Sequence, residues 1–276
     1  MDLLATAEHM LAAAGLHTNL PGFLALFGLA LARILMAVTL APFFGGQSVP
    51  GRIRVGLGVI LTAVLLPGLQ TTQSFNLSPM VFVALLAKEV LIGAVLGIVC
   101  QFVFYGIQMA GVLIDTQRGM NQMSFFAPQL AGPASVLGQL QLQLAIVVFL
   151  IAGGHLMYLR ALDASFRALP VLAFPRIAGG TTAFLETVAR LSANSLIIGL
   201  QMAAPVLLAL LLVDVCFGVV GRMASQINVH QESQPVKALA GLGVFFLAAG
   251  FLMGRMQFHL GTMMNAVNEM VRVLKP

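Results

Sequence analysis

Four charged residues lie inside otherwise apolar stretches of the sequence: Arg33, Lys88, Glu89 and Asp214. Ionised groups are costly in hydrocarbon, so such residues mark either a polar path, such as a proton relay, or ion pairs buried within protein. The sequence has no series of acids along one predicted helix, which favours ion pairs between helices or subunits. Because Lys88 and Glu89 are adjacent, a helix would turn their side chains about 100° apart, and we expect them to face different partners.

Another acid and base stand at the end of a long apolar run. Asp115 and Arg118 are three residues apart, a spacing at which side chains pair on the surface of a helix. Gly119 follows directly and favours a turn. We therefore expect this pair to fix the point where the helix ends.

The segment that follows, residues 119–138, is a predicted loop of unusual composition. Its bulky apolar residues are Met120, Met123, Phe125 and Phe126, and its predicted hinge residues are Gly119, Pro128, Gly132 and Pro133. Loops usually run through water and avoid such apolar residues. Either the four apolar side chains pack against neighbouring helices, or the loop lies in a pore and closes it.

No catalytic motif is visible in the sequence. It contains no phosphate-binding loop, no nucleophile elbow and no HExxH pair, and the five histidines are scattered without partners at ligand spacing. We therefore expect a non-enzymatic protein with no catalytic, cofactor-binding or metal-binding residues. The fourteen lysines and arginines form no basic cluster with interleaved aromatics, so we expect no nucleic-acid partner.

The composition predicts an all-α protein of highly hydrophobic helices in contact with membrane lipid. Of the residues, 59% are hydrophobic and 8% are charged, whereas about a quarter are charged in a soluble domain. Several charge-free intervals exceed the roughly 20 residues of a membrane-spanning helix. Amphipathic helices are predicted at 2–14 and 257–274, a helix ends at Pro67, and apolar segments are predicted at 23–40, 80–114, 139–159, 191–220 and 238–254, with a connector at 221–237.

The distribution of arginines does not orient these segments as simple membrane spans. Arg52 and Arg54 place the first connector inside, and alternation would then put residues 160–190, which contain four arginines, outside. Either one segment is a hairpin that does not cross, or the helices are not ordinary membrane spans.

Four motifs occur in order along the chain. They are APFFGGQSVPGRIRVGLGVILTAVLLP at 41–67, LIDTQRG at 113–119, GGHLMYLRALDASFRALP at 153–170 and QINVHQESQPVK at 226–237. Together they resemble the T-subunit family of the bacterial type III secretion export gate, whose flagellar counterpart is the R protein of the flagellar export apparatus. The D-x-Q-R-G form of the second motif resembles the virulence branch more than the flagellar one.

The resemblance implies an architecture and a set of partners. An R-like helical part, 1–190, with a central plug loop at 119–138, would be followed by an S-like helical hairpin, 191–276. Such a chain would assemble with R and S subunits into a closed helical channel for unfolded proteins and would contact the switch subunit, U. It would lie in the bacterial inner membrane, within the base of the secretion apparatus and partly above the bilayer plane. Helices buried among subunits need not follow lipid topology.

The resemblance also implies roles for particular residues. Met120, Met123, Phe125 and Phe126 would form a hydrophobic plug that denies water and ions any polar partner in the idle channel. Gln226, Asn228, Pro235 and Lys237 would contact partners at the channel entrance. The alternative for this second group is a plain turn between helices, with Pro235 as the first residue of a helix.

A second function remains open for the sequence. Broken helices and intramembrane charges would also suit a small proton-coupled secondary transporter or permease. The two halves of the sequence show no evident inverted repeat, which argues against this alternative.

Overall fold

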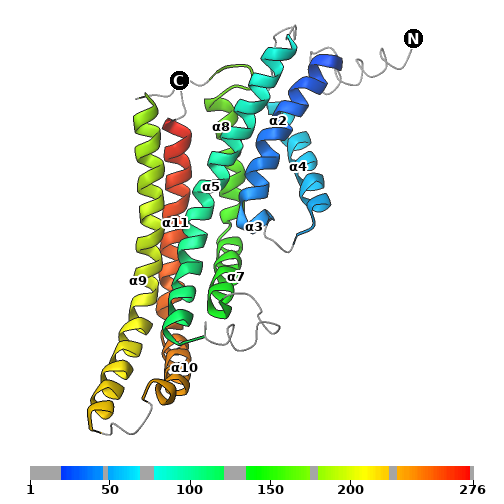
Figure 1. The fold of residues 1–276 in the computed structure, drawn as a ribbon. Helices are drawn as coiled ribbons and strands as arrows, with labels where there is room; N and C mark the ends of the chain where they lie inside the picture. Colours follow the sequence, from blue (N-terminus) through cyan, green and yellow to red (C-terminus); the bar gives the residue numbers. More distant parts are fainter. Residues whose placement is uncertain are drawn as a thin grey trace. The chain divides into compact units, whose positions relative to one another are not determined.

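The computed structural model describes residues 20–45, 49–68, 78–120, 135–174, 180–223 and 229–273, and every regular element in these ranges is helical. The all-α prediction is confirmed. The helices are α2 (Leu20–Leu40), α3 (Pro42–Gly45), α4 (Gly51–Leu65), η1 (Leu66–Gly68), α5 (Pro79–Gln117), α7 (Val136–Ile151), α8 (Gly154–Ala168), α9 (Gly180–Met223), α10 (Val229–Leu247) and α11 (Ala249–Val273) (Figure 1).

Several helix boundaries differ from those predicted. The predicted segment 139–159 is interrupted at Ala152 and Gly153, where Gly153 takes a φ of 72° that favours glycine. The predicted fifth segment begins earlier, because α9 starts at Gly180 and runs through the expected domain boundary at 190/191. That division into two domains stays a prediction. The predicted helix 2–14 lies outside the described residues.

The region predicted as a connector, 221–237, is the largest difference. Helix α10 already begins at Val229, and the chain bends by 62° at the break between α10 and α11. The expectation that Pro235 begins a helix is therefore wrong, since Pro235 lies inside α10. A proline in a helix removes one backbone hydrogen bond, but this one lies within two turns of the N-terminus of α10. Taking the proline as a signal for the start of a helix therefore placed the start of α10 too late in the sequence.

The structure divides into two compact units. Unit 1 comprises Met1–Gln101, His155–Val188 and Met264–Pro276, and unit 2 comprises Phe102–Gly154 and Ala189–Met263. The unit boundaries fall inside α5, α9 and α11 and after the first residue of α8.

Unit 1 is built around α2, which lies beside α4 (Figure 1). Its core consists of Leu26, Leu29, Ala30, Ile34 and Val38 of α2 with Leu66, Leu85, Phe166 and Val171. Two glycines of α5, Gly93 and Gly97, permit a close crossing with α2. A Cβ at Gly93 would collide with the carbonyl of Arg33, and one at Gly97 would lie 2.5 Å from Leu40 Cβ. Small residues spaced four apart are a common device for close helix packing in membranes.

Unit 2 packs the second part of α5 against α7 and α9. Gly111 of α5 lies directly against Gly138 of α7, and a Cβ at Gly138 would lie 2.9 Å from Val112 Cγ2 of α5. Gly106 of α5 approaches α9, where an added Cβ would lie 2.6 Å from the carbonyl oxygen of Ser195. These contacts fix α5 against both neighbours at backbone distance.

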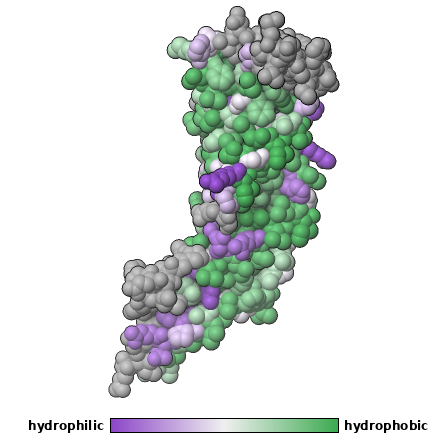
Figure 2. Space-filling model, turned by 90° about the vertical axis from the view of Figure 1, so that its right-hand side faces the viewer, coloured by the Kyte–Doolittle hydropathy of each residue, from purple (hydrophilic) through white to green (hydrophobic). Residues whose placement is uncertain are grey.

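Within the described residues, three helices are long and apolar enough to cross a membrane: Pro21–Leu40, Pro79–Gln117 and Leu185–Met223. The number rises to five if each of the two bent helix pairs in the described residues is one span. Apolar side chains cover most of the face visible in Figure 2, with hydrophilic ones in small separate groups. Exposed apolar residues of α9 include Leu196, Leu200, Leu208, Leu212 and Val219. Such surface requires lipid or another protein to cover it.

Candidate functional site

Asp115 joins the two sides of the segment 121–134. Its Oδ1 accepts a hydrogen bond from Arg118 Nη1 at 3.0 Å, just before this segment. Its Oδ2 accepts from Ser135 Oγ and from the backbone N–H of Leu137, both at 2.8 Å, just after it. Only 1% of Asp115 is exposed. We call Asp115, Ser135 and the Leu137 N–H the clasp.

The clasp sits at the N-terminus of α7. Ser135 is the N-cap: its backbone is extended, with a φ of −148°, and its hydroxyl accepts from the N–H of Gly138 at 2.8 Å. The first N–H groups of a helix have no partner within the helix, and their end of the helix dipole favours an anion. The carboxylate of Asp115 therefore stabilises the start of α7 by hydrogen bonding and by charge.

Arg118 connects this site to α10. Its Nε donates to the carbonyl oxygen of Ala238 at 3.1 Å, while Nη1 holds Asp115. The stem of Arg118 lies on Gly241, where an added Cβ would stand 2.7 Å from both Cγ and Cδ. Gly119 has a φ of 77°, and a Cβ there would collide with the side chain of Gln234 of α10. Two glycines thus let the turn after α5 lie directly on α10.

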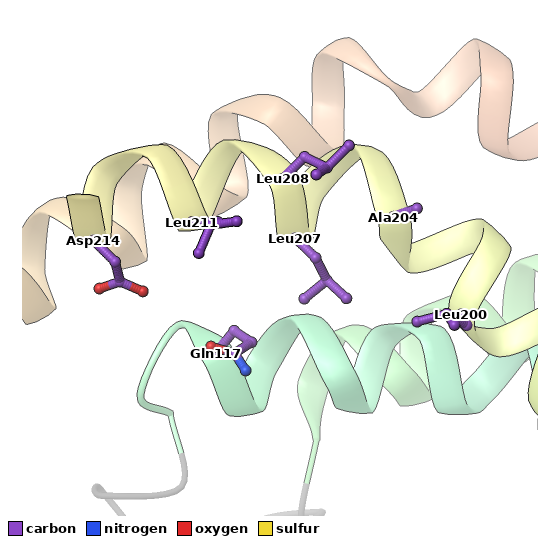
Figure 3. Close-up of a pocket in the computed structure, with 7 residues that line it drawn as sticks. All are labelled: Gln117, Leu200, Ala204, Leu207, Leu208, Leu211 and Asp214. Carbon is purple, nitrogen blue, oxygen red and sulfur yellow. The ribbon is translucent and has the colours of Figure 1, made fainter. Parts of the chain in front are cut away.

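The same part of unit 2 contains a second ion pair and a groove. Lys237 Nζ of α10 pairs with Asp214 Oδ1 of α9. A groove of about 370 Å³ runs between α9 and the end of α5. Figure 3 shows Asp214 and Gln117 at one end of it and Leu200 at the other, with Leu207 and other aliphatic side chains between them. The polar groups are confined to the end nearest the clasp.

Unit 1 contains a separate buried cluster of three charges. Arg33 is fully buried, and its guanidinium binds both carboxylate oxygens of Glu89, with Nε 2.5 Å from Oε2 and Nη2 3.0 Å from Oε1. The same guanidinium donates to Ser165 Oγ at 3.3 Å and to the carbonyl of Leu169 at 2.9 Å. Lys88 Nζ lies 2.7 Å from Glu89 Oε1.

The expectation that Lys88 and Glu89 face different partners is wrong. The long stem of Lys88 carries its ammonium group back to Glu89, and Nζ also donates to the carbonyls of Pro170, Val171 and Ala173 at 3.2, 2.6 and 2.9 Å. Lys88 therefore shares Glu89 with Arg33 and also faces the turn that follows α8. Backbone direction alone gave the wrong result because a lysine side chain reaches about one helical turn.

Residues 24–263 match the family described as bacterial export proteins, family 1. The chain belongs to this family.

Individual relatives cover most of the chain. Flagellar biosynthetic protein FliR of Pectobacterium carotovorum subsp. carotovorum is 34% identical over 212 residues, covering 76% of this chain and 78% of the relative. Yop proteins translocation protein T of Yersinia pestis is 27% identical over 219 residues, covering 78% and 83%. Surface presentation of antigens protein SpaR of Shigella sonnei is 26% identical over 235 residues, covering 84% and 88%. The resemblance to the type III export family is confirmed, but these identities do not favour the virulence branch over the flagellar one.

The structure places part of the predicted site of this export-family chain. Asp115 and Arg118 form the predicted pair, and Gly119 and half-buried Met120 follow them in a turn. On α10, Pro235 is exposed and Lys237 is 9% exposed. The other predicted plug, hinge and entrance residues lie outside the described residues: Met123, Phe125, Phe126, Pro128, Gly132, Pro133, Gln226 and Asn228. The roles of all these residues stay predictions.

Several residues of the site escaped the sequence analysis. Ser135 could have been found, because a serine directly before an apolar run is a typical N-cap signal. The carbonyl of Ala238 and the bare surface of Gly241 carry no such signal, since they matter only through their position against Arg118. Within the described residues, no group of three or more His, Cys, Asp or Glu could hold a metal ion.

Proposed function

We propose that the chain is a non-enzymatic subunit of the type III export gate, which assembles with R and S subunits into a closed helical channel for unfolded proteins. The family match over residues 24–263 is the observation that carries this proposal. The extensive apolar surface of α9 is consistent with burial against sister subunits. The gate would lie in the inner membrane and partly above the bilayer plane.

The predicted loop 119–138 ends earlier in the structure, since α7 begins at Val136. The second part of the proposal is that the segment 119–135 plugs the idle channel. Methionine and phenylalanine side chains suit this role, because they exclude water and adapt to different partners. The clasp supports it from the described residues: Asp115 ties Ser135 and Leu137 to the end of α5. The two ends of the segment are thereby held together.

The third part concerns partners. The switch subunit U, or the cytosolic export machinery, would contact the start of α10 and the residues before it, including Gln226, Asn228, Pro235 and Lys237. Exposure of Pro235 supports accessibility of this helix in the single chain. The ion pair between Lys237 and Asp214 indicates that Lys237 also has a role within the chain.

Deletion of residues 121–131 tests the plug. We expect cells with the deleted gate to assemble it and to export substrates, but to leak small ions when export is idle. The measurement is the loss of membrane potential or of a trapped small solute in cells whose gate is recovered intact. A deletion strain that assembles, exports and stays tight contradicts the plug.

A further inference from the structure

We propose that Arg118 is a positioning residue that couples α10 to the clasp. The proposal rests on the proposed function, because the clasp lies at the two ends of the segment that would plug the channel. It goes beyond that function by naming the residue through which a partner bound at α10 would act on the base of the loop.

The guanidinium of Arg118 joins α10 to Asp115. Arg118 uses Nη1 for the carboxylate of Asp115 and Nε for the carbonyl of Ala238. These donors belong to one rigid planar group, so neither bond can change direction independently of the other. A displacement of α10 against α5 therefore turns the group that orients Asp115.

The aliphatic part of the Arg118 side chain also packs against α10. Arg118 is 9% exposed, and its aliphatic carbons fill the space that a side chain at position 241 would occupy. The contact is close, since a single carbon added to Gly241 would lie 2.7 Å from Cγ and Cδ of Arg118. Movement of α10 is thus passed to Arg118 sterically as well as by hydrogen bonding.

The chain of contacts then reaches α7. Asp115 holds Arg118 with one carboxylate oxygen, and Ser135 and the Leu137 N–H with the other. Turning the carboxylate to follow Arg118 weakens the bonds to α7, and the two sides of 121–134 are then no longer joined. If Asp115 and Arg118 served only to end α5, their own ion pair would suffice, and the contact of Arg118 with Gly241 would have no role.

Two glycine substitutions in α10 provide a matched test. Gly241→Ala places a methyl group on the stem of Arg118, whereas Gly243→Ala meets nothing within 4 Å. Both changes raise helix propensity equally. The measurement is hydrogen–deuterium exchange of peptides covering 135–142, in the full chain purified from membranes with its accompanying subunits. We expect Gly241→Ala to speed exchange at the start of α7 about tenfold, and Gly243→Ala to leave it unchanged.

A second variant guards against a folding defect in the first. Arg118→Lys keeps the positive charge beside Asp115 but lacks the planar group that also reaches Ala238. We expect it to accelerate the same exchange as Gly241→Ala. If charge alone matters, Arg118→Lys behaves as wild type, which overturns the proposal.

The exchange measurement also separates this proposal from the plug. Faster exchange in the purified Gly241→Ala chain, with cells of the same variant remaining tight to ions, supports the coupling and counts against the plug. Faster exchange together with an idle leak supports both. Equal exchange in the Gly241→Ala and Gly243→Ala chains overturns the coupling, whatever the leak shows.

Discussion

Two buried carboxylates, Glu89 in unit 1 and Asp115 in unit 2, each bind an arginine but in different ways. Both oxygens of Glu89 are occupied by cations, those of Arg33 and Lys88. Only one oxygen of Asp115 is bound to a cation, while the other is bound to the start of a helix. Glu89 is thus the centre of an ion cluster, whereas Asp115 caps the N-terminus of α7 and also binds an arginine.

The number of bonds to each neighbouring element differs as well. In unit 1, Arg33 and Lys88 together donate to the carbonyls of Leu169, Pro170, Val171 and Ala173, directly after α8. These bonds give the donors of the two cations partners in the turn after α8. In unit 2, single bonds from one guanidinium join the clasp to α10. Many bonds per element lock helices together, whereas single bonds leave a contact that a partner can shift.

Removal of the acid from the unit 1 cluster should have the largest effect. Glu89→Ala leaves two cations buried without a counter-ion, which costs about 3–5 kcal/mol of the free energy of unfolding. We expect the chain to fail to accumulate in membranes. The measurement is the amount of full-length chain, together with its resistance to protease in mild detergent.

An exposed ion pair of the same unit provides the control. Arg167 and Asp163 pair at 2.7 Å, but the arginine side chain is 77% exposed. Exposed pairs contribute little, so Asp163→Ala should leave the amount of chain near that of wild type. An equal loss of chain in Glu89→Ala and Asp163→Ala would mean that burial of the Glu89 cluster does not increase its contribution to stability.

The crossing of α2 and α5 gives a smaller effect in the same unit. Gly93→Ala drives a methyl group into the backbone of Arg33, which no side-chain rotation can relieve. We expect a loss of about 1–3 kcal/mol, typical of an overpacked core. Gly28→Ala, which meets nothing within 4 Å, is the matched control. Thermal unfolding of the purified complex measures both, and an unchanged midpoint in Gly93→Ala would refute the close crossing.

Local sequence rules were sufficient to predict part of this molecule. Charge-free runs predicted an all-α membrane chain, and the i,i+3 spacing predicted the pair of Asp115 and Arg118. Both follow from local rules, in which period and composition suffice. The sequence also predicted that charges within apolar segments form ion pairs between helices, and Arg33 of α2 and Glu89 of α5 form such a pair.

What could not be predicted depends on contacts between distant residues. Arg33 meets Ser165 and Leu169 across more than 130 positions, and no spacing rule encodes that meeting. The start of α10 was misplaced for a different reason. Polar residues and Pro235 predicted a connector, yet a proline near the start of a helix removes only one bond, which packing against Arg118 and Asp214 can offset.

The effect most confined to one element, and the most informative about mechanism, should come from a double variant that exchanges the charges of Asp115 and Arg118 in unit 2. The double variant Asp115→Arg with Arg118→Asp keeps an i,i+3 pair at the end of α5, with both charges exchanged. It removes the carboxylate from Ser135 and Leu137 and places a cation at the N-terminus of α7, where the helix dipole disfavours it. We expect about 1–3 kcal/mol of lost local stability at α7, an assembled gate and an idle leak. If the pair only ends α5, the exchanged pair performs as well as the original. An idle gate as tight as wild type, with unchanged exchange at the start of α7, would therefore reduce Asp115 to a helix terminator and remove the distinction between the two carboxylates.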